Sequence, residues 1–280
     1  MRISKKKTVD LNTGSTLYID GGGKGHFRLL DYITVTQIKP CMHNNLGKRY
    51  QILSWALLIF STYSTASLCA QDSSFTRPPV TSQVSDYWQQ VNSDPSKKMV
   101  ELKSIMPHLV YDLRYATTNN FMHRSMYPGK TRRTYLRQPA ALALSEVQKE
   151  LNEKGFGLKI FDAYRPFSVT VKFWELVKDE RYVANPSKGS GHNRGIAVDL
   201  TIINLTTGLE LDMGTGFDNF TDSAHQTFTA LPEEILQNRA LLKTTMEKHG
   251  FKALDTEWWH YFLANGDRFE VLDLKFKQLH

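Results

Sequence analysis

Hydrophobic and polar positions recur along the chain with helical spacing in some stretches and with strand spacing in others. A helix is predicted over 139–151, where Ala140, Leu144 and Val147 fall on one face. Similar spacing predicts two further helices, at 168–178 and 232–248. Short apolar or alternating runs predict strands over 100–102, 109–115, 157–164, 196–203 and 258–263.

These elements predict the α+β class, as a single domain with a mainly antiparallel central sheet flanked by helices. Helices and strands follow one another without a strict strand–helix–strand alternation, and no internal repeat is visible. The stretch 196–203 is apolar at nearly every position, which predicts a strand buried on both faces. Ser168 stands at the start of the second helix, where it is suited to act as a cap.

A basic flank and a short apolar run lie far upstream of the predicted sheet. Two basic residues precede the apolar stretch 52–60, and small residues follow it through Ala66 and Ala70. This order is typical of a secretory signal peptide, and the apolar run is too short to cross a bilayer. We therefore predict a signal peptide over 42–70, cleaved after Ala66 or Ala70, with no stable membrane insertion after cleavage.

The first forty-one residues do not fit this leader, because a signal peptide normally begins close to its basic flank. A chain that starts at Met42 has the usual proportions. We expect 1–41 to be an extension that comes from a mis-assigned start codon. The alternative is a cytoplasmic extension ahead of an uncleaved anchor. The mature protein is expected to be periplasmic or secreted.

The segment that follows the leader, 71–99, is polar and interrupted by prolines. Such a composition predicts a linker or a loosely docked arm. The folded domain is then expected to occupy 100–280.

The net charge of +7 does not indicate a nucleic-acid partner. Residues 1–41 contain seven Lys or Arg against three Asp, and 42–70 add two cations and no acid, which leaves about +1 for the rest of the chain. The basic character belongs to the leader, and we expect no nucleic-acid binding. The two cysteines, Cys41 and Cys69, lie there as well, so a metal in the folded body must be held by nitrogen and oxygen.

Two histidines and an aspartate form the strongest chemical pattern in the chain. His192 lies in a loop rich in Gly and Ser, Asp199 in the apolar strand that follows, and His260 in the last predicted strand. A lone buried aspartate needs a charged partner or a metal ion. A catalytic zinc ion is bound by three protein ligands, and two histidines with one aspartate supply that number. Each residue alone has an ordinary alternative: Asp199 as the cap of a turn, His192 as a surface histidine and His260 as a core histidine. Together they predict one zinc ion per chain.

Three further residues are suited to act around such a metal. Glu257 precedes His260 by three positions, so it must lie at an irregular strand start to share the site, where it would act as general base. Its alternative is a solvated carboxylate at a turn. Arg165 could stabilise a developing oxyanion, form a structural ion pair with Asp162, or do both. Ser190 could hydrogen-bond the substrate or a ligand.

These residues also carry a family resemblance. Residues 190–199 resemble the Ser-x-His-x-x-Gly-x-Ala-x-Asp signature, and 257–260 the Glu-x-x-His signature, of zinc D-alanyl-D-alanine dipeptidases. These are enzymes of the vancomycin-resistance type, within the wider group of D-Ala-D-Ala carboxypeptidases. Segments 112–121, 162–166 and 213–218 are similar to further blocks of the family, in the same order. The resemblance covers roughly 100–265.

The resemblance implies an α+β domain whose central sheet carries a zinc ion bound by His192, Asp199 and His260. It implies that Glu257 is the general base and acid, that Arg165 stabilises the transition state, and that Asp218 faces the ammonium group of the substrate.

The expected reaction is therefore hydrolysis of D-Ala-D-Ala to two D-Ala. The expected partner is a small D-amino-acid peptide, which peptidoglycan turnover could supply. Two alternatives stay open: a peptidoglycan stem-peptide carboxypeptidase or endopeptidase of the same fold, and a non-catalytic zinc-binding module.

Overall fold

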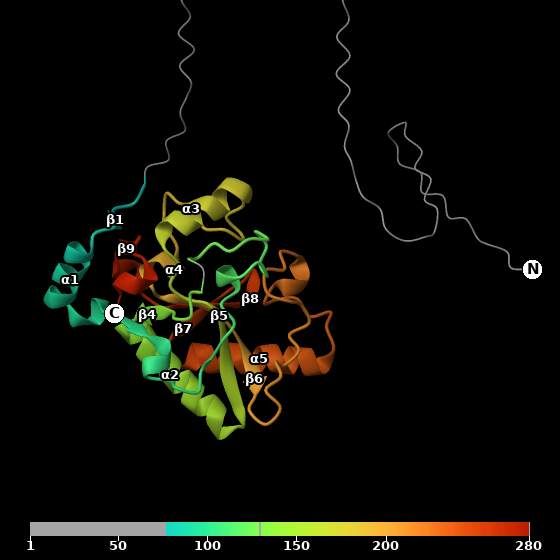
Figure 1. Cartoon of the computed structure of the whole chain (residues 1–280). Helices are drawn as coiled ribbons and strands as arrows, with labels where there is room; N and C mark the ends of the chain where they lie inside the picture. The colour runs from blue at the N-terminus through green and yellow to red at the C-terminus, as the bar shows by residue number, and fades with distance from the viewer. Residues whose placement is uncertain (1–76, 129, 280) are drawn as a thin grey trace, which may run out of the picture. The chain divides into compact units, whose positions relative to one another are not determined.

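Within residues 77–128 and 130–279, the part of the chain that the computed structural model describes, five strands form the central sheet in the order β3, β5, β6, β8, β7 (Figure 1). β3 pairs with β5 in parallel, and the other three neighbouring pairs are antiparallel. The sheet is mixed but mainly antiparallel, and the predicted α+β class is confirmed. The strands are β3 (Val110–Tyr111), β5 (Phe156–Asp162), β6 (Ala197–Asn204), β7 (Phe251–Leu254) and β8 (Glu257–Leu263).

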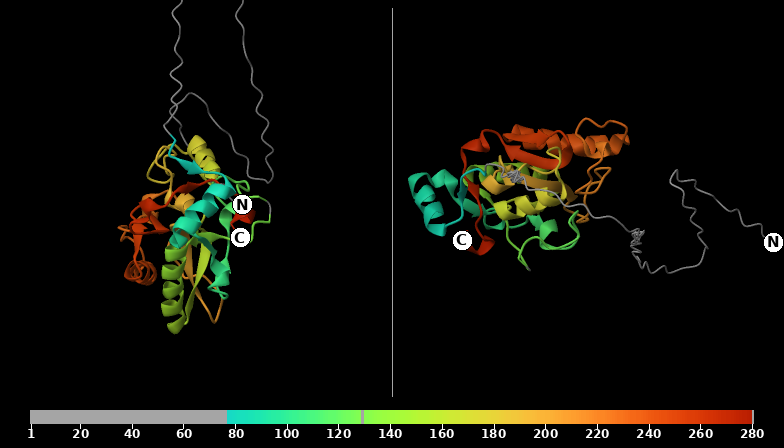
Figure 2. Two further views of the ribbon diagram at one scale, coloured as in Figure 1. Left: turned by 90° about the vertical axis from the view of Figure 1, so that its left-hand side faces the viewer. Right: turned by 90° about the horizontal axis from the view of Figure 1, so that it is seen from above.

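Helices flank the sheet. Figure 1 shows α2 and α5 in the lower half of the domain, beside β5 and β6, and α3 at the top, and the right-hand view of Figure 2 shows α1 at one end of the domain. The three helices predicted from the sequence are confirmed to within two residues at each end. The α-helices are α1 (Val84–Ser93), α2 (Gln138–Glu153), α3 (Phe167–Leu176), α4 (Gly191–Arg194) and α5 (Glu233–Lys248).

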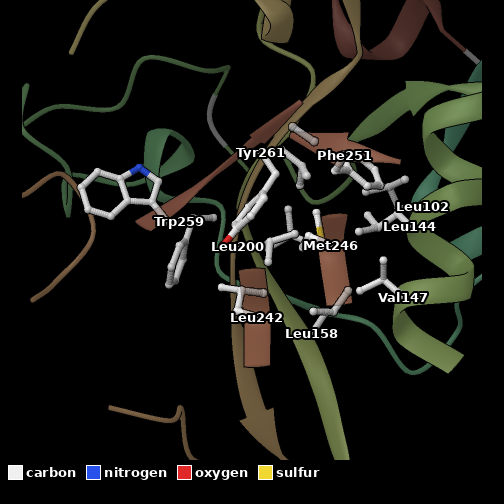
Figure 3. Packing of buried hydrophobic residues seen from close by; sticks show 14 of the residues in the cluster. Leu102, Leu144, Val147, Leu158, Leu200, Leu242, Met246, Phe251, Trp259 and Tyr261 are labelled. Carbon is white, nitrogen blue, oxygen red and sulfur yellow. The ribbon is translucent and has the colours of Figure 1, made fainter. Parts of the chain in front are cut away.

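The main hydrophobic core lies between the sheet and the pair α2 and α5. Leu144 and Val147 of α2 meet Leu242 and Met246 of α5 against the central strands (Figure 3). β6 is buried at seven of its eight positions, which confirms the prediction of a strand covered on both faces. Close packing on both sides holds the central strands rigidly, and the functional side chains project from their ends.

Two short strand pairs extend the fold at its periphery. β1 (Val80–Thr81) pairs in parallel with β9 (Val271–Leu272), and β2 (Met99–Glu101) pairs in antiparallel fashion with β4 (Tyr135–Arg137). Single-turn 3-10 helices connect the larger elements: η1 (Pro95–Lys97), η2 (Leu102–Ser104), η3 (Arg114–Ala116), η4 (Asp222–Ala224), η5 (Gly266–Arg268) and η6 (Phe276–Gln278).

The linker prediction for 71–99 is wrong for the part of it that the structure describes. Residues 84–93 form helix α1, and Tyr87 is fully buried among aromatic and aliphatic side chains. Its hydroxyl accepts a hydrogen bond of 2.8 Å from the backbone N–H of Met99. The segment looks polar in sequence because α1 fully buries only Tyr87 and Val91, with Val84 and Trp88 partly buried beside them, and most of its other residues are exposed.

Two local predictions also need correction. The strand expected over 109–115 is only the two-residue β3, because the chain turns into η3 directly afterwards. Ser168 does not cap α3, since the helix already begins at Phe167. The acceptor at this helix start is instead the carboxylate of Asp273, which receives bonds of 3.0 Å from the backbone N–H and 2.8 Å from the hydroxyl of Ser168.

The expected extension 1–41 and the signal peptide 42–70 lie outside the described residues and stay predictions. Within the described part of the chain, no helix has the length and apolar character needed to span a membrane.

Candidate metal centre and active site

The centre of the site lies where three neighbouring strands reach the same level of the sheet. Asp162 at the end of β5 is the register partner of Asp199 in β6, and Asp199 is the register partner of His260 in β8. A register shift between Ile160 and Asp162 inserts Phe161 into β5, so that Asp162 stands opposite Asp199. The sheet thus brings two carboxylates and an imidazole together across three strands.

A second irregularity places Glu257. The pairing of β7 with β8 shifts between Ala253 and Leu254, so that Leu254 becomes the partner of Glu257 at the first position of β8. The Glu257 side chain is buried, and its Oε2 lies 3.8 Å from Nδ1 of His260. The expectation that Glu257 occupies an irregular strand start beside His260 is confirmed.

His192 is presented by the short helix α4. The hydroxyl of Ser190 accepts a bond of 3.2 Å from the N–H of Asn193, whose side-chain oxygen accepts one of 2.9 Å from the N–H of Ser190. The amide of Asn193 also donates to the carbonyl of Arg165 at 2.8 Å. Gly195 ends the helix with φ +72°, where a Cβ would also collide with a neighbouring side chain. His192 is therefore held beside the segment that carries Arg165.

Three side chains from these elements bring potential metal-binding atoms together. Nδ1 of His192 donates a bond of 2.7 Å to the carbonyl of Ala163, which leaves its Nε2 as the free lone pair. That Nε2 lies 3.2 Å from Nδ1 of His260 and 3.3 Å from Oδ2 of Asp199. His260 Nδ1 lies 2.9 Å from Oδ1 of Asp199. A tetrahedral zinc ion with bonds of about 2.0–2.1 Å needs neighbouring ligand atoms about 3.3 Å apart, so the spacing fits.

The electrostatic state of these residues also fits a metal. Burial alone would raise the pKa of Asp199, but His192 and His260 hold it below its usual value. Burial lowers the pKa of His260. A carboxylate binds a metal ion in its ionised form, and an imidazole such as that of His260 binds one in its neutral form. Among the described residues, His192, Asp199 and His260 form a group that could hold a metal ion, because one potential ligand atom from each lies within 4.8 Å of the others.

Glu257 lies in surroundings that favour its protonated form. Burial raises the pKa of its carboxyl well above the usual value, and the negative charges of Asp199 and Asp218 act in the same direction. A carboxyl group with raised proton affinity is suited to take up a proton and release it again near neutral pH.

The guanidinium of Arg165 is held by an ion pair. Its Nε and Nη2 lie 2.9 and 2.8 Å from Oδ2 of Asp162, and the hydroxyl of Tyr127 donates to the other oxygen of this carboxylate. Nη2 also lies 3.6 Å from Oδ2 of Asp199. Arg165 therefore forms the buried ion pair expected with Asp162 and stands at the edge of the metal cluster, while its role toward an oxyanion stays a prediction.

Asp218 lies at another wall of the same pocket, with φ +61°. The hydroxyl of Tyr115 donates to its Oδ1 at 2.8 Å, and the N–H of Phe121 donates to its Oδ2 at 3.1 Å. The ring of Tyr115 lies under the guanidinium of Arg165, with 5.0 Å between the guanidinium carbon and the ring centre. Burial raises the pKa of Asp218 to about 7.

These side chains line one pocket with a volume of about 230 Å³. Phe121, Tyr182 and Phe220 form part of its wall, and we call these three residues the aromatic rim. Tyr182 and Phe220 come from different segments of the chain and stack with ring centres 4.9 Å apart. Phe121 meets Phe220 edge to face at 5.3 Å. The rim lies next to Asp218, because the backbone of Phe121 binds that carboxylate.

All seven side chains singled out from the sequence line this pocket: Arg165, Ser190, His192, Asp199, Asp218, Glu257 and His260. Apart from Asp162, which was expected to pair with Arg165, the sequence did not show the partners that orient them. Tyr115 lies in a segment that carried the family resemblance, but no local signal indicates that its hydroxyl binds Asp218. Nothing in the sequence pattern pointed to Tyr127.

Comparison with known proteins decides the family. The sequence profile of the Peptidase M15 family, described as D-ala-D-ala dipeptidase, matches residues 95–276, which is more than half of the chain. The chain belongs to this family. It is therefore a peptidase, and the match begins after β1 and α1.

Individual relatives agree with this assignment. This M15 peptidase is 34% identical over 175 residues to the D-alanyl-D-alanine dipeptidase of Escherichia coli (strain K12), covering 62% of this chain and 89% of that protein. It is 33% identical over 173 residues to the D-alanyl-D-alanine dipeptidase of Enterococcus faecalis (strain ATCC 700802 / V583), covering 55% and 86%.

Among solved structures, the LdcB LD-carboxypeptidase has 22% identity and a TM-score of 0.33, covering 49% of this chain and 63% of that one. That structural likeness is weak, and the family assignment of this peptidase rests on the sequence match.

Proposed function

We propose that this peptidase hydrolyses D-Ala-D-Ala to two D-Ala, with one zinc ion bound by His192, Asp199 and His260. The observation that carries the proposal is the convergence of these three donor atoms, within hydrogen-bonding range of one another, beside Glu257. Support for the substrate comes from the curated relatives, which are named D-alanyl-D-alanine dipeptidases and match this chain over most of their length.

In the proposed reaction, each side chain has one task. When bound, the zinc ion activates water and polarises the scissile carbonyl. Glu257 accepts a proton from the attacking water and donates it to the leaving amine. Arg165, oriented by Asp162, hydrogen-bonds the carbonyl oxygen as negative charge develops there. The hydroxyl of Ser190 accepts a bond from within α4, so its own proton is available to the substrate.

The pocket favours a short substrate with a free amino terminus. The carboxylate of Asp218 is buried and fixed by two donors, so it can pair with an ammonium group. The aromatic rim stands beside it, where a residue in front of that ammonium group would have to pass. The pocket volume of about 230 Å³ is also below the range of about 300–1,000 Å³ usual for ligand sites. These features favour a free dipeptide over a stem peptide.

The decisive experiment separates catalysis from metal binding. The variant Glu257→Ala should lose D-Ala release while it keeps stoichiometric zinc, because Glu257 moves protons and does not ligate the metal. Glu234→Ala, which removes an exposed carboxylate elsewhere, is the matched control and should behave like the wild type. Retained turnover in Glu257→Ala, or loss of its zinc, would disprove the assigned role. Turnover by the wild type would also exclude the non-catalytic zinc module.

The carboxypeptidase or endopeptidase alternative is tested by capping the substrate. A dipeptidase that pairs Asp218 with ammonium should cleave free D-Ala-D-Ala and leave its N-acylated form almost untouched. Comparable rates on both substrates would favour the stem-peptide enzyme.

Export is a separate part of the proposal. The basic and apolar pattern of 42–70 supports a cleaved signal peptide and a periplasmic or secreted enzyme, with peptidoglycan turnover as a source of substrate. Mass spectrometry of the N-terminus of protein isolated from producing cells tests this. A first residue at position 67 or 71 is expected, and a mature chain that still begins at Met1 would contradict it.

A further inference from the structure

A second groove, formed by other parts of the chain, combines strong positive charge with a defined shape. It has a volume of about 570 Å³, and we call it the basic groove. No acidic residue is among those that line it. They are Pro128, Lys130, Thr131, Arg132, Arg133, Tyr135, Lys275, Phe276 and Lys277.

The five cations of the basic groove are exposed and have no carboxylate partner among the described residues. Arg133 hydrogen-bonds the hydroxyl of Tyr135, which is a neutral group. Several cations elsewhere on the domain do have a carboxylate partner: Lys97 pairs with Glu270, Lys159 with Glu210 and Lys248 with Glu150. The charge in the groove is therefore available to a ligand.

The concentration of charge is not explained by composition. Residues after Ala70 have a net charge of about +1, so the folded body is nearly neutral as a whole. Five like charges around one concavity repel one another and raise the local potential. An anion bound among them would remove that repulsion.

Local hydrogen bonds shape both walls of the groove, and a ring contact ties the second wall to the core. On the first wall, the backbone N–H and the hydroxyl of Thr131 donate to the carbonyl of Pro128 at 3.1 and 2.7 Å. On the second, the side chain of Gln278 accepts a bond of 2.7 Å from the N–H of Lys275. Phe276 packs edge to face on Tyr127 with ring centres 4.9 Å apart. The second wall is thus anchored on the core by Phe276, and a local turn shapes the first.

We propose that the basic groove binds an anion that carries several phosphate groups. Guanidinium groups bind phosphate through paired hydrogen bonds, and lysines add charge without demanding a fixed geometry. Five cations on two facing walls match a ligand with several charges better than a single small anion. The volume of the groove lies inside the range typical of ligand sites. This proposal is independent of the peptidase reaction, because none of these cations lines the zinc pocket.

The test is calorimetric titration of the purified protein with inorganic tripolyphosphate. We expect saturable binding with one site per chain that weakens as salt rises. The double variant Arg132→Ala/Lys277→Ala removes one cation from each wall and should weaken binding about tenfold or more. The control Lys172→Ala/Lys252→Ala removes the same charge from exposed positions outside the groove and should leave binding unchanged. Thermal unfolding of all variants checks that each is folded.

Three results would overturn the proposal. Absence of saturable binding at low salt would show that the groove is only a solvated surface. Equal weakening in the control pair would show that net charge, not the groove, attracts the anion. Binding to vesicles of phosphatidylglycerol, or to a single-stranded oligonucleotide, without binding to tripolyphosphate would assign the surface to a membrane or a nucleic acid instead.

Discussion

Asp199 and His260 face one another as register partners on β6 and β8, with Oδ1 of the carboxylate 2.9 Å from Nδ1 of the imidazole. Because both strands are central in the sheet, this pairing is set by backbone hydrogen bonds and does not depend on loop conformation. His192 completes the cluster from α4, with its tautomer set by the carbonyl of Ala163. The positions of these three side chains are therefore organised by the fold.

The first prediction concerns the charge of Asp199. Asp199→Asn keeps the shape of the side chain but removes the negative charge. Loss of a residue that only orients a ligand lowers metal affinity by about 10- to 100-fold, so loss of the charge of a ligand itself should lower zinc affinity by about a hundredfold or more. Competition with a chelator measures it. Asp86→Asn, at an exposed carboxylate of α1 that does not line the pocket, serves as control. Wild-type affinity in Asp199→Asn would remove Asp199 from the ligand set.

The second prediction compares the two partners of the Asp162 carboxylate. Asp162→Asn leaves the buried guanidinium of Arg165 without a full counter-charge, so the free energy of unfolding should fall by about 3–5 kcal/mol. Tyr127→Phe removes one hydrogen-bond donor from the same carboxylate and should lower it by only about 1–3 kcal/mol. Urea denaturation measures both. Equal losses would mean that the ion pair is not the dominant interaction.

The variant Asp162→Asn should also affect kcat and KM to different extents. If Arg165 acts on the transition state, Asp162→Asn should lower kcat more than it raises KM, because the guanidinium loses its orientation. A change in KM alone would place Arg165 in ground-state binding.

The third prediction is a pH dependence that belongs to Asp218. Burial raises its pKa to about 7, so the carboxylate that pairs with the substrate's ammonium group exists above that pH and is lost as the pH falls through it. For the wild type, kcat/KM on free dipeptide should fall about tenfold per pH unit below about pH 7. Asp218→Asn should have lower kcat/KM and lose this acidic limb. An unchanged limb in the variant would assign it to another group, such as Glu257.

The fourth prediction concerns the aromatic rim. Tyr182→Ala removes the ring stacked on Phe220 and should open the pocket beside Asp218. The ratio of kcat/KM for N-acylated over free D-Ala-D-Ala should then rise about tenfold, which corresponds to about 1.4 kcal/mol of transition-state energy. Tyr182→Phe keeps the stacked ring and should retain the wild-type ratio. If both variants behave alike, the rim does not limit substrate length.

The sequence by itself determined the fold class, the main helices and the set of functional side chains. Helix α2 and strand β6 follow from local periodicity, which a single segment carries in full. His192, Asp199 and His260 stood out because polar groups with metal-binding chemistry occur at fixed spacings between apolar positions. These signals are local, so they can be seen without the fold.

Tertiary structure alone decided how the site is oriented and what surrounds it. The extra residue in β5 that brings Asp162 opposite Asp199 depends on pairing between two strands. The hydroxyl of Tyr115 reaches Asp218 across 103 positions of sequence, and α1 looks like a linker until Tyr87 is seen to be buried. Such contacts join residues whose local patterns are ordinary. They form because the core fixes where each strand and loop ends, and no segment carries that information alone.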